Sequence, residues 1–71
     1  MDRQQEDLYR GLVTYLMKQR SCDDTLKNTQ AHLRARGGSL AALQFQITSH
    51  YGYEAVCDCK VMAMMGMMLT P

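Results

Sequence analysis

The feature that most constrains this 71-residue chain is the uneven distribution of its charges. Residues 1–36 hold twelve of the fifteen charged side chains, whereas residues 61–69 hold none and read Val-Met-Ala-Met-Met-Gly-Met-Met-Leu. An uncharged segment of this kind has to be buried, and a chain this short offers only a small globular body for it. We therefore expect a partner protein, or a second copy of the chain, to cover the segment.

The size of the chain allows one small domain, and a core below about 70–80 residues gives only a few kcal/mol of stability without a disulfide, a metal or an oligomer. The three cysteines are an odd number, and Cys57 and Cys59 are too close in sequence to suit a mutual disulfide. Free thiols in a reducing compartment are the simpler interpretation. The polar first residues also lack the apolar stretch of a secretion signal, so we expect a cytoplasmic protein.

The charge pattern argues against two classes of function. Residues 1–36 carry a net charge of +2 and residues 37–71 a net charge of −1, and neither half has the clustered basic face of a nucleic-acid-binding protein. The uncharged run is also far shorter than the roughly 20 residues that span a bilayer. We expect no nucleic acid and no membrane span among the interactions of this chain.

Apolar residues recur at helical spacing from residue 6 to residue 36, a stretch without proline in which Gly11 is the one glycine. The apolar stripe thins near Ser21, and Ser21 and Asp24 have the spacing of a capping box. Residues 6–36 therefore form either one helix, continuous or kinked near residue 21, or two helices that meet at Ser21. We favour the single helix.

The clearest interruption follows at Gly37 and Gly38, where a left-handed helix cap is easily formed and Ser39 can cap the next helix. Helical spacing then resumes over residues 39–69, and Gly52 is a point where this helix bends or ends. Apolar and polar residues alternate over residues 53–61, which is the period of a strand. We favour a helix here, because a lone strand would leave its backbone unpaired.

These patterns predict an all-α protein in which residues 1–71 form a single two-helix hairpin. Its helices cover about residues 6–36 and 39–69, the turn is at residues 37–38, and an oligomer or a partner completes the core. The residues expected in the hairpin core lie on the facing apolar stripes. They are Leu8, Leu12, Leu16, Leu26, Leu40, Leu43 and Ile47.

No residue set points to catalysis, because the sequence offers no nucleophile–base–orienter set and no phosphate-binding loop. His50, Cys57 and Cys59 lack a second pair of ligands at zinc-site spacing. The methionines of residues 61–69 surround a helix and do not converge on a point. We expect no enzyme activity, no metal and no cofactor, and we expect His32, which lies among polar residues, to be solvated.

The methionines predict a binding surface instead. Their unbranched, polarizable side chains adapt to irregular apolar partners. A two-helix hairpin buries one face of its second helix, whereas this segment is apolar on every face, so part of it should face outward. The expected partner-binding residues are Phe45, Tyr51, Val61, Met62, Met64, Met65, Met67, Met68 and Leu69.

Two segments around the turn carry a family resemblance. Residues 39–47, Ser-Leu-Ala-Ala-Leu-Gln-Phe-Gln-Ile, are followed by Tyr51 and Tyr53, and this pattern resembles the second helix of needle and inner-rod subunits of bacterial type III secretion systems. The end of the first helix at residues 33–37, Leu-Arg-Ala-Arg-Gly, followed by Leu-Gln-Phe-Gln at residues 43–46, resembles the small co-chaperones of the same systems.

The co-chaperone is the closer of the two resemblances, since the turn has two glycines instead of proline and methionines replace the polar C-terminal residues of a needle subunit. This resemblance implies a cytosolic helical hairpin that acts in protein transport and virulence. Such a hairpin associates with a larger helical-repeat chaperone, and together they cover a needle subunit until its export. A needle or inner-rod structural subunit is the alternative.

A different class of protein also remains open. Residues 8–16, a break near Ser21, a helical stretch to residue 36 and the Gly-Gly turn look like the start of small eukaryotic transcription and export adaptors. Those adaptors wrap short helices around a long partner helix. Two long helices would favour the secretion function, whereas four or five short helices would favour the adaptor.

Overall fold

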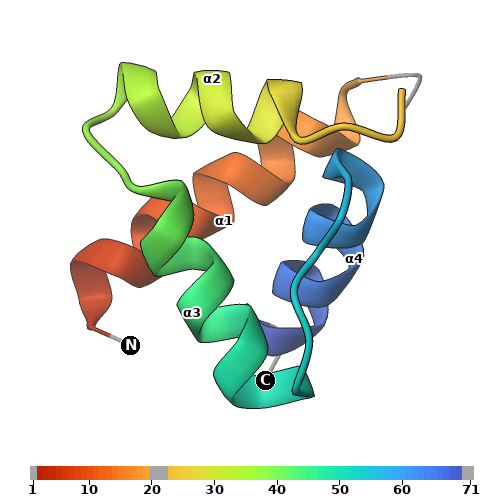
Figure 1. Ribbon diagram of the computed structural model, residues 1–71. Helices are drawn as coiled ribbons and strands as arrows, with labels where there is room; N and C mark the ends of the chain where they lie inside the picture. The colour runs from red at the N-terminus through yellow and green to blue at the C-terminus, as the bar shows by residue number, and fades with distance from the viewer. Residues whose placement is uncertain (1, 20–22, 70–71) are drawn as a thin grey trace.

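The computed structural model describes residues 2–19 and 23–69, which form four helices (Figure 1). α1 spans Arg3–Met17, α2 spans Lys27–Ala35, α3 spans Leu40–Tyr51 and α4 spans Asp58–Leu69. The described residues contain no strand, so the prediction of an all-α fold is confirmed. The predicted hairpin is too coarse, because each of its two long helices is divided into two. The described part of the chain measures 28 × 25 × 23 Å, whereas a straight helix over residues 6–36 would be about 46 Å long.

The first expected helix is interrupted because local hydrogen bonds replace helical ones on both sides of residues 20–22. α1 ends in a tightened turn, in which the Lys18 N–H donates to the Tyr15 carbonyl at 3.1 Å. Ahead of α2, the Asp23 carboxylate accepts from the Thr25 N–H at 3.2 Å and also from the Thr25 hydroxyl. Such a turn competes with helix formation, so α2 begins only at Lys27.

α2 has no cap of its own. Ser21, the predicted cap, lies outside the described residues, and the N-cap position is held by Leu26, whose side chain has no acceptor. The Asp58 carboxylate supplies the missing cap from the start of α4. Its two oxygens accept from the Asn28 N–H at 3.1 Å and from the Thr29 N–H at 2.9 Å. These are the donors that a local capping side chain normally satisfies.

Asp58 also bonds in the reverse direction, because its own N–H donates to the Thr25 carbonyl at 2.8 Å. Its side chain is buried, and its carboxylate lies at the N-terminus of α2 and in the first turn of α4. Negative charge at a helix N-terminus is favourable. One residue therefore stabilises the starts of two helices that are about thirty residues apart in sequence.

The turn at Gly37 and Gly38 is found where the sequence predicts it. Gly37 is left-handed, with φ of 73°, and the Gly38 N–H donates to the Leu33 carbonyl at 2.7 Å, which closes a Schellman motif. A Cβ on Gly38 would lie 3.0 Å from the side chains of Leu33 and Leu8, so any other residue there would require these two side chains to shift. Ser39 then caps α3, accepting at 3.2 Å from the N–H three residues ahead.

The second expected helix ends at Gly52, which has a φ of 87°. Residues 53–57 are neither helix nor strand, so the favoured helix is wrong for this segment. The buried side chain of Gln44 satisfies the backbone instead. Its Nε2 donates to the Ala55 carbonyl at 2.7 Å, and its Oε1 accepts from the Ala55 N–H at 2.9 Å. The side-chain amide of Gln44 thus pairs with the backbone of Ala55 as a neighbouring strand would.

The core lies where the four helices face one another, and α1 packs most extensively against α4 (Figure 1). Of the residues expected in the hairpin core, four are buried: Leu12, Leu16, Leu43 and Ile47. The other three, Leu8, Leu26 and Leu40, are partly buried and pack against this core. All seven residues therefore contribute to one core formed by four helices, and not to an interface between two long helices.

Much of the uncharged segment, residues 61–69, is covered by the other helices of the same chain. Val61, Met64, Met65 and Leu69, all expected at a partner surface, lie in the core. They fall on one face of α4, a helix that packs mainly against α1. The Tyr51 hydroxyl, which donates to the Met64 carbonyl at 2.9 Å, fastens α4 to the end of α3.

Removing the Asp58 carboxylate should therefore weaken the whole fold. We expect Asp58→Ala to lower the free energy of unfolding by about 2 kcal/mol, because one buried and one partly buried N–H group of α2 lose their acceptor. Asp58→Asn retains one acceptor oxygen and should lose about half as much. Urea denaturation followed by circular dichroism measures both values. Equal stability of the wild type and Asp58→Ala would contradict the capping role.

Candidate functional site

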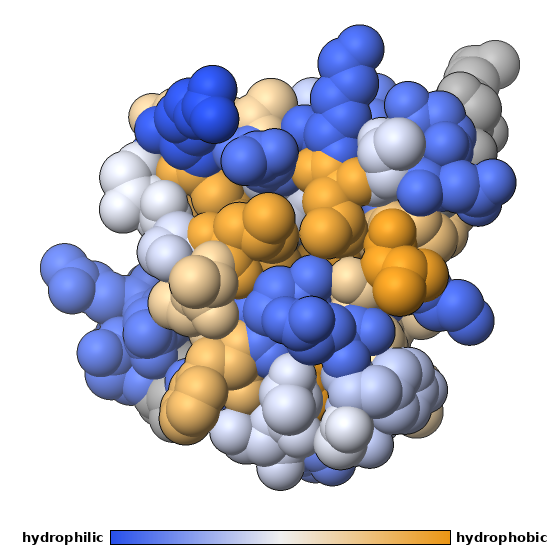
Figure 2. Space-filling model, viewed as in Figure 1, coloured by the Kyte–Doolittle hydropathy of each residue, from blue (hydrophilic) through white to orange (hydrophobic). Residues whose placement is uncertain are grey.

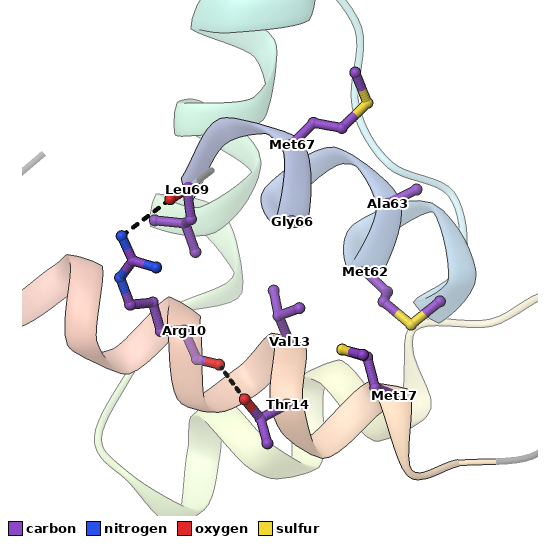
Figure 3. Close-up of a pocket in the computed structure, with 9 residues that line it drawn as sticks. All are labelled: Arg10, Val13, Thr14, Met17, Met62, Ala63, Gly66, Met67 and Leu69. Atoms are coloured by element: carbon purple, nitrogen blue, oxygen red, sulfur yellow. Dashed lines mark hydrogen bonds between the residues drawn. The ribbon is translucent and has the colours of Figure 1, made fainter. Parts of the chain in front are cut away.

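The feature best suited to bind another molecule is a groove of about 680 Å³ between α1 and α4 (Figure 3). Most of its lining is apolar, and Arg10 is the single charged side chain in it. The wall from α1 is Arg10, Val13, Thr14 and Met17, and the wall from α4 is Met62, Ala63, Gly66, Met67 and Leu69.

The floor of the groove lies where Val13 of α1 faces Gly66 of α4. Val13 points toward Gly66 in Figure 3, and a Cβ on Gly66 would lie 3.9 Å from Val13 Cγ1. Gly66 has no side chain and Ala63 has a single methyl group, so few side-chain atoms of α4 project into this part of the groove. The backbone of a bound segment could therefore lie close to α4 here.

The sides of the groove are formed by methionines. Met17 and Met62 extend toward each other across one end, and Met67 extends outward from the rim on α4 (Figure 3). Met17 and Met67 are 69% and 71% exposed, which is unusual for large apolar side chains. Flexible thioether side chains of this kind adapt to a range of apolar partners.

The polar groups of the groove are already engaged within the chain. The Arg10 guanidinium donates to the Leu69 carbonyl at 2.9 Å and to Glu6 Oε1 at 2.9 Å, so it joins the C-terminal end of α4 to α1. The Thr14 hydroxyl donates to the Arg10 carbonyl at 3.0 Å (Figure 3). The groove therefore favours an apolar ligand, with Arg10 as a positive group at one end.

The structure divides the expected partner-binding residues among three places. Met62, Met67 and Leu69 line the groove, and Leu69 also borders the core. Val61, Met64 and Met65 are in the core, where Tyr51 and Met68 pack against them. Phe45 is exposed on α3, away from the groove.

The α1 wall of the groove is absent from the sequence prediction. Arg10, Val13, Thr14 and Met17 lie at i, i+3, i+4 and i+7, which places them on one face of a helix. This spacing could have identified the face. Two of the four side chains are polar, however, so the sequence alone makes it resemble a solvated surface.

A second set of exposed apolar side chains lies over α3 and the segment before α4. Its members are Phe45, Tyr53 and Val56. Figure 2 shows the face of the molecule over α2, α3 and this segment, and hydrophilic side chains interrupt the apolar surface there. This face is less continuous than the groove, which makes the groove the stronger candidate.

Across residues 2–19 and 23–69, no three His, Cys, Asp or Glu side chains are grouped as metal ligands would be. Cys57 is a buried thiol outside any disulfide. Within the same residues, no helix has the length and apolar character needed to cross a bilayer.

Comparison of the chain with protein-family models, with curated protein sequences and with solved structures gives no match. The functional argument therefore depends on the groove and its residues.

His32 differs from the sequence expectation, because it is buried and not solvated. Its ring lies 4.8 Å from the ring of Tyr15, between α2 and α1. Among the described residues, its Nε2 has no hydrogen-bond partner. Burial, together with the positive charge of Arg36, lowers the pKa of His32 below its ordinary value of 6.5.

This lowered pKa predicts a pH-dependent stability. Because the folded state favours the neutral ring, the unfolded state takes up the proton first, and stability should fall as the pH drops from about 6.5 through the folded pKa. His32→Phe retains the stacking on Tyr15 and does not titrate. We expect the wild type to lose stability between about pH 8 and about pH 5, and the variant to lose less.

Thermal unfolding of both proteins across this pH range provides the measurement. At about pH 8, the variant should be at least as stable as the wild type, because it removes a buried nitrogen without a partner. Identical pH profiles for the two proteins would assign the dependence to another group.

Proposed function

We propose that this protein is a small non-enzymatic adaptor of the cytoplasm that binds an amphipathic helix of a partner protein in the α1–α4 groove. The observation that carries the proposal is the lining of this groove. It combines a low floor at Ala63 and Gly66, adaptable methionine sides and one charged residue at its end. A catalytic reaction would need polar groups directed into the groove, whereas Thr14 and Arg10 bond to the chain itself.

A helix suits the shape of this groove. α4 has 12 residues and is therefore about 18 Å long, which corresponds to three to four turns of a third helix packed beside α1 and α4. An extended peptide that binds by strand addition would need an open strand edge, and the described residues contain no strand. Apolar residues at i, i+3, i+4 and i+7 of the partner would contact the methionines.

A partner of a different sequence fits better than a second copy of this chain. The large apolar side chains exposed on the described helices are Met17 on α1, Phe45 on α3 and Met67 on α4. No described helix thus presents a row of them that could fill the groove of another copy.

The number of helices bears on the choice between a type III secretion protein and an adaptor. The co-chaperone and the needle subunit each imply a hairpin of two long helices, whereas the described chain has four short ones. Four short helices are what the adaptor interpretation implies. A role in type III secretion stays a prediction, and the adaptor is the function that we propose.

The groove can be tested with a designed helical peptide of about 14 residues, with leucines at i, i+3, i+4 and i+7 and a glutamate near each end. The protein is labelled with carbon-13 at its methionine methyl groups. We expect the peptide to shift the NMR signals of Met17, Met62 and Met67 and to leave those of Met64 and Met65 nearly unchanged.

A matched pair of variants then locates the site. Ala63→Glu puts a charge in the groove wall and should weaken peptide binding about tenfold or more, because the charge must be desolvated. Ala41→Glu makes the same change on the exposed side of α3 and should have no effect. Equal affinity of the two variants would overturn the groove as the binding site, and self-association measured by light scattering would indicate a second copy as its occupant.

A further inference from the structure

Five methionines among the described residues fall into two groups according to their burial. Met17 and Met67 are largely exposed at the groove, and Met62 is half-buried there. Met64 and Met65 are 6% and 0% exposed in the core, although they belong to the same helix as Met67. Neighbouring residues of α4 therefore differ sharply in their access to solvent.

We propose that the groove methionines Met17, Met62 and Met67 are the sites of reversible oxidation by peroxide, and that their oxidation closes the groove to an apolar partner. In this step the thioether sulfur attacks one oxygen of hydrogen peroxide and the O–O bond breaks. The sulfur loses two electrons as the S–O bond forms, and the other oxygen leaves as water. Reduction by a dithiol-dependent methionine sulfoxide reductase returns the thioether and releases water and a disulfide.

The selectivity follows from access to the sulfur. Peroxide reaches Met17 and Met67 directly from solvent, whereas it reaches Met64 and Met65 only when the fold opens. The core of α4, which contains Val61, stays apolar and packed during limited oxidation. The molecule therefore remains folded while its surface changes.

The effect on the groove follows from the chemistry of its sides. A sulfoxide is polar, and the groove offers it few donors, because Arg10 and Thr14 bond to the chain. An apolar helix that covers a sulfoxide would leave the S–O group without a partner, which weakens binding about tenfold or more. This second part of the inference rests on the proposed function, whereas the order of oxidation does not.

The test uses the whole protein, labelled with carbon-13 at its methionine methyl groups and treated with limited hydrogen peroxide. One series of NMR spectra reports the oxidation of each methionine, and circular dichroism reports the fold. We expect Met17 and Met67 to be oxidised first, Met62 next, and Met64 and Met65 at least about tenfold more slowly. The designed peptide should bind before treatment, lose about tenfold or more in affinity after it, and bind again after reduction by the reductases.

Variants separate the groove methionines from the others. A triple variant with Met17→Leu, Met62→Leu and Met67→Leu keeps the apolar sides and should bind the peptide with the same affinity before and after peroxide. Met68→Leu removes a half-buried methionine outside the groove lining and should retain the sensitivity of the wild type.

The outcomes distinguish the two proposals. Oxidation of Met64 and Met65 as fast as that of Met17 would overturn the selective site, whatever the peptide does. Selective oxidation of a protein that never binds the peptide would count against the proposed function and not against the site. Selective oxidation with unchanged peptide affinity would overturn the switch alone.

Discussion

The fold depends on a single carboxylate that serves two helices. The Asp58 carboxylate accepts hydrogen bonds from two backbone N–H groups in the first turn of α2, and Asp58 is itself the first residue of α4. Without this contact, no side chain would cap α2, because its N-cap residue is Leu26. The bond from the Asp58 N–H to the Thr25 carbonyl makes the connection mutual. The position of α4, and with it one wall of the groove, is therefore coupled to the start of a helix on the other half of the chain.

The sequence predicts best what depends on neighbouring residues. Helical periodicity identified the all-α class, and the paired glycines identified the turn, because Gly37 and Gly38 form their cap from bonds within α2. The ends of α1 and α3 were harder to predict. α2 is capped by a residue about thirty positions away, and the backbone of Ala55 is paired by the side chain of Gln44. Neither partner is adjacent in sequence, so the sequence marked the two breaks only by a thinner apolar stripe near Ser21 and by Gly52, and longer helices were favoured.

Some of the residues that line the groove could be predicted from the sequence, and others could not. The composition of α4 indicated a helix with more apolar surface than one neighbour could cover. The fold agrees in part, since Val61 and Met65 face the core while Met62 and Met67 line the groove. The sequence did not reveal which face of α4 points inward, because all its faces are apolar. The wall from α1 was missed for the opposite reason, since Thr14 and Arg10 look like solvated residues until α4 is packed beside them.

The groove combines fixed and adaptable parts, and this division bears on what it can recognise. Its floor lies where Val13 faces Gly66, and one end is fixed by the bond from Arg10 to the Leu69 carbonyl. Its sides are methionines, whose side chains change rotamer at little cost. The packing of α1 against α4 would therefore limit how deeply a partner helix could enter the groove. The identity of its apolar side chains would matter less, because Met17 and Met67 can adjust to them.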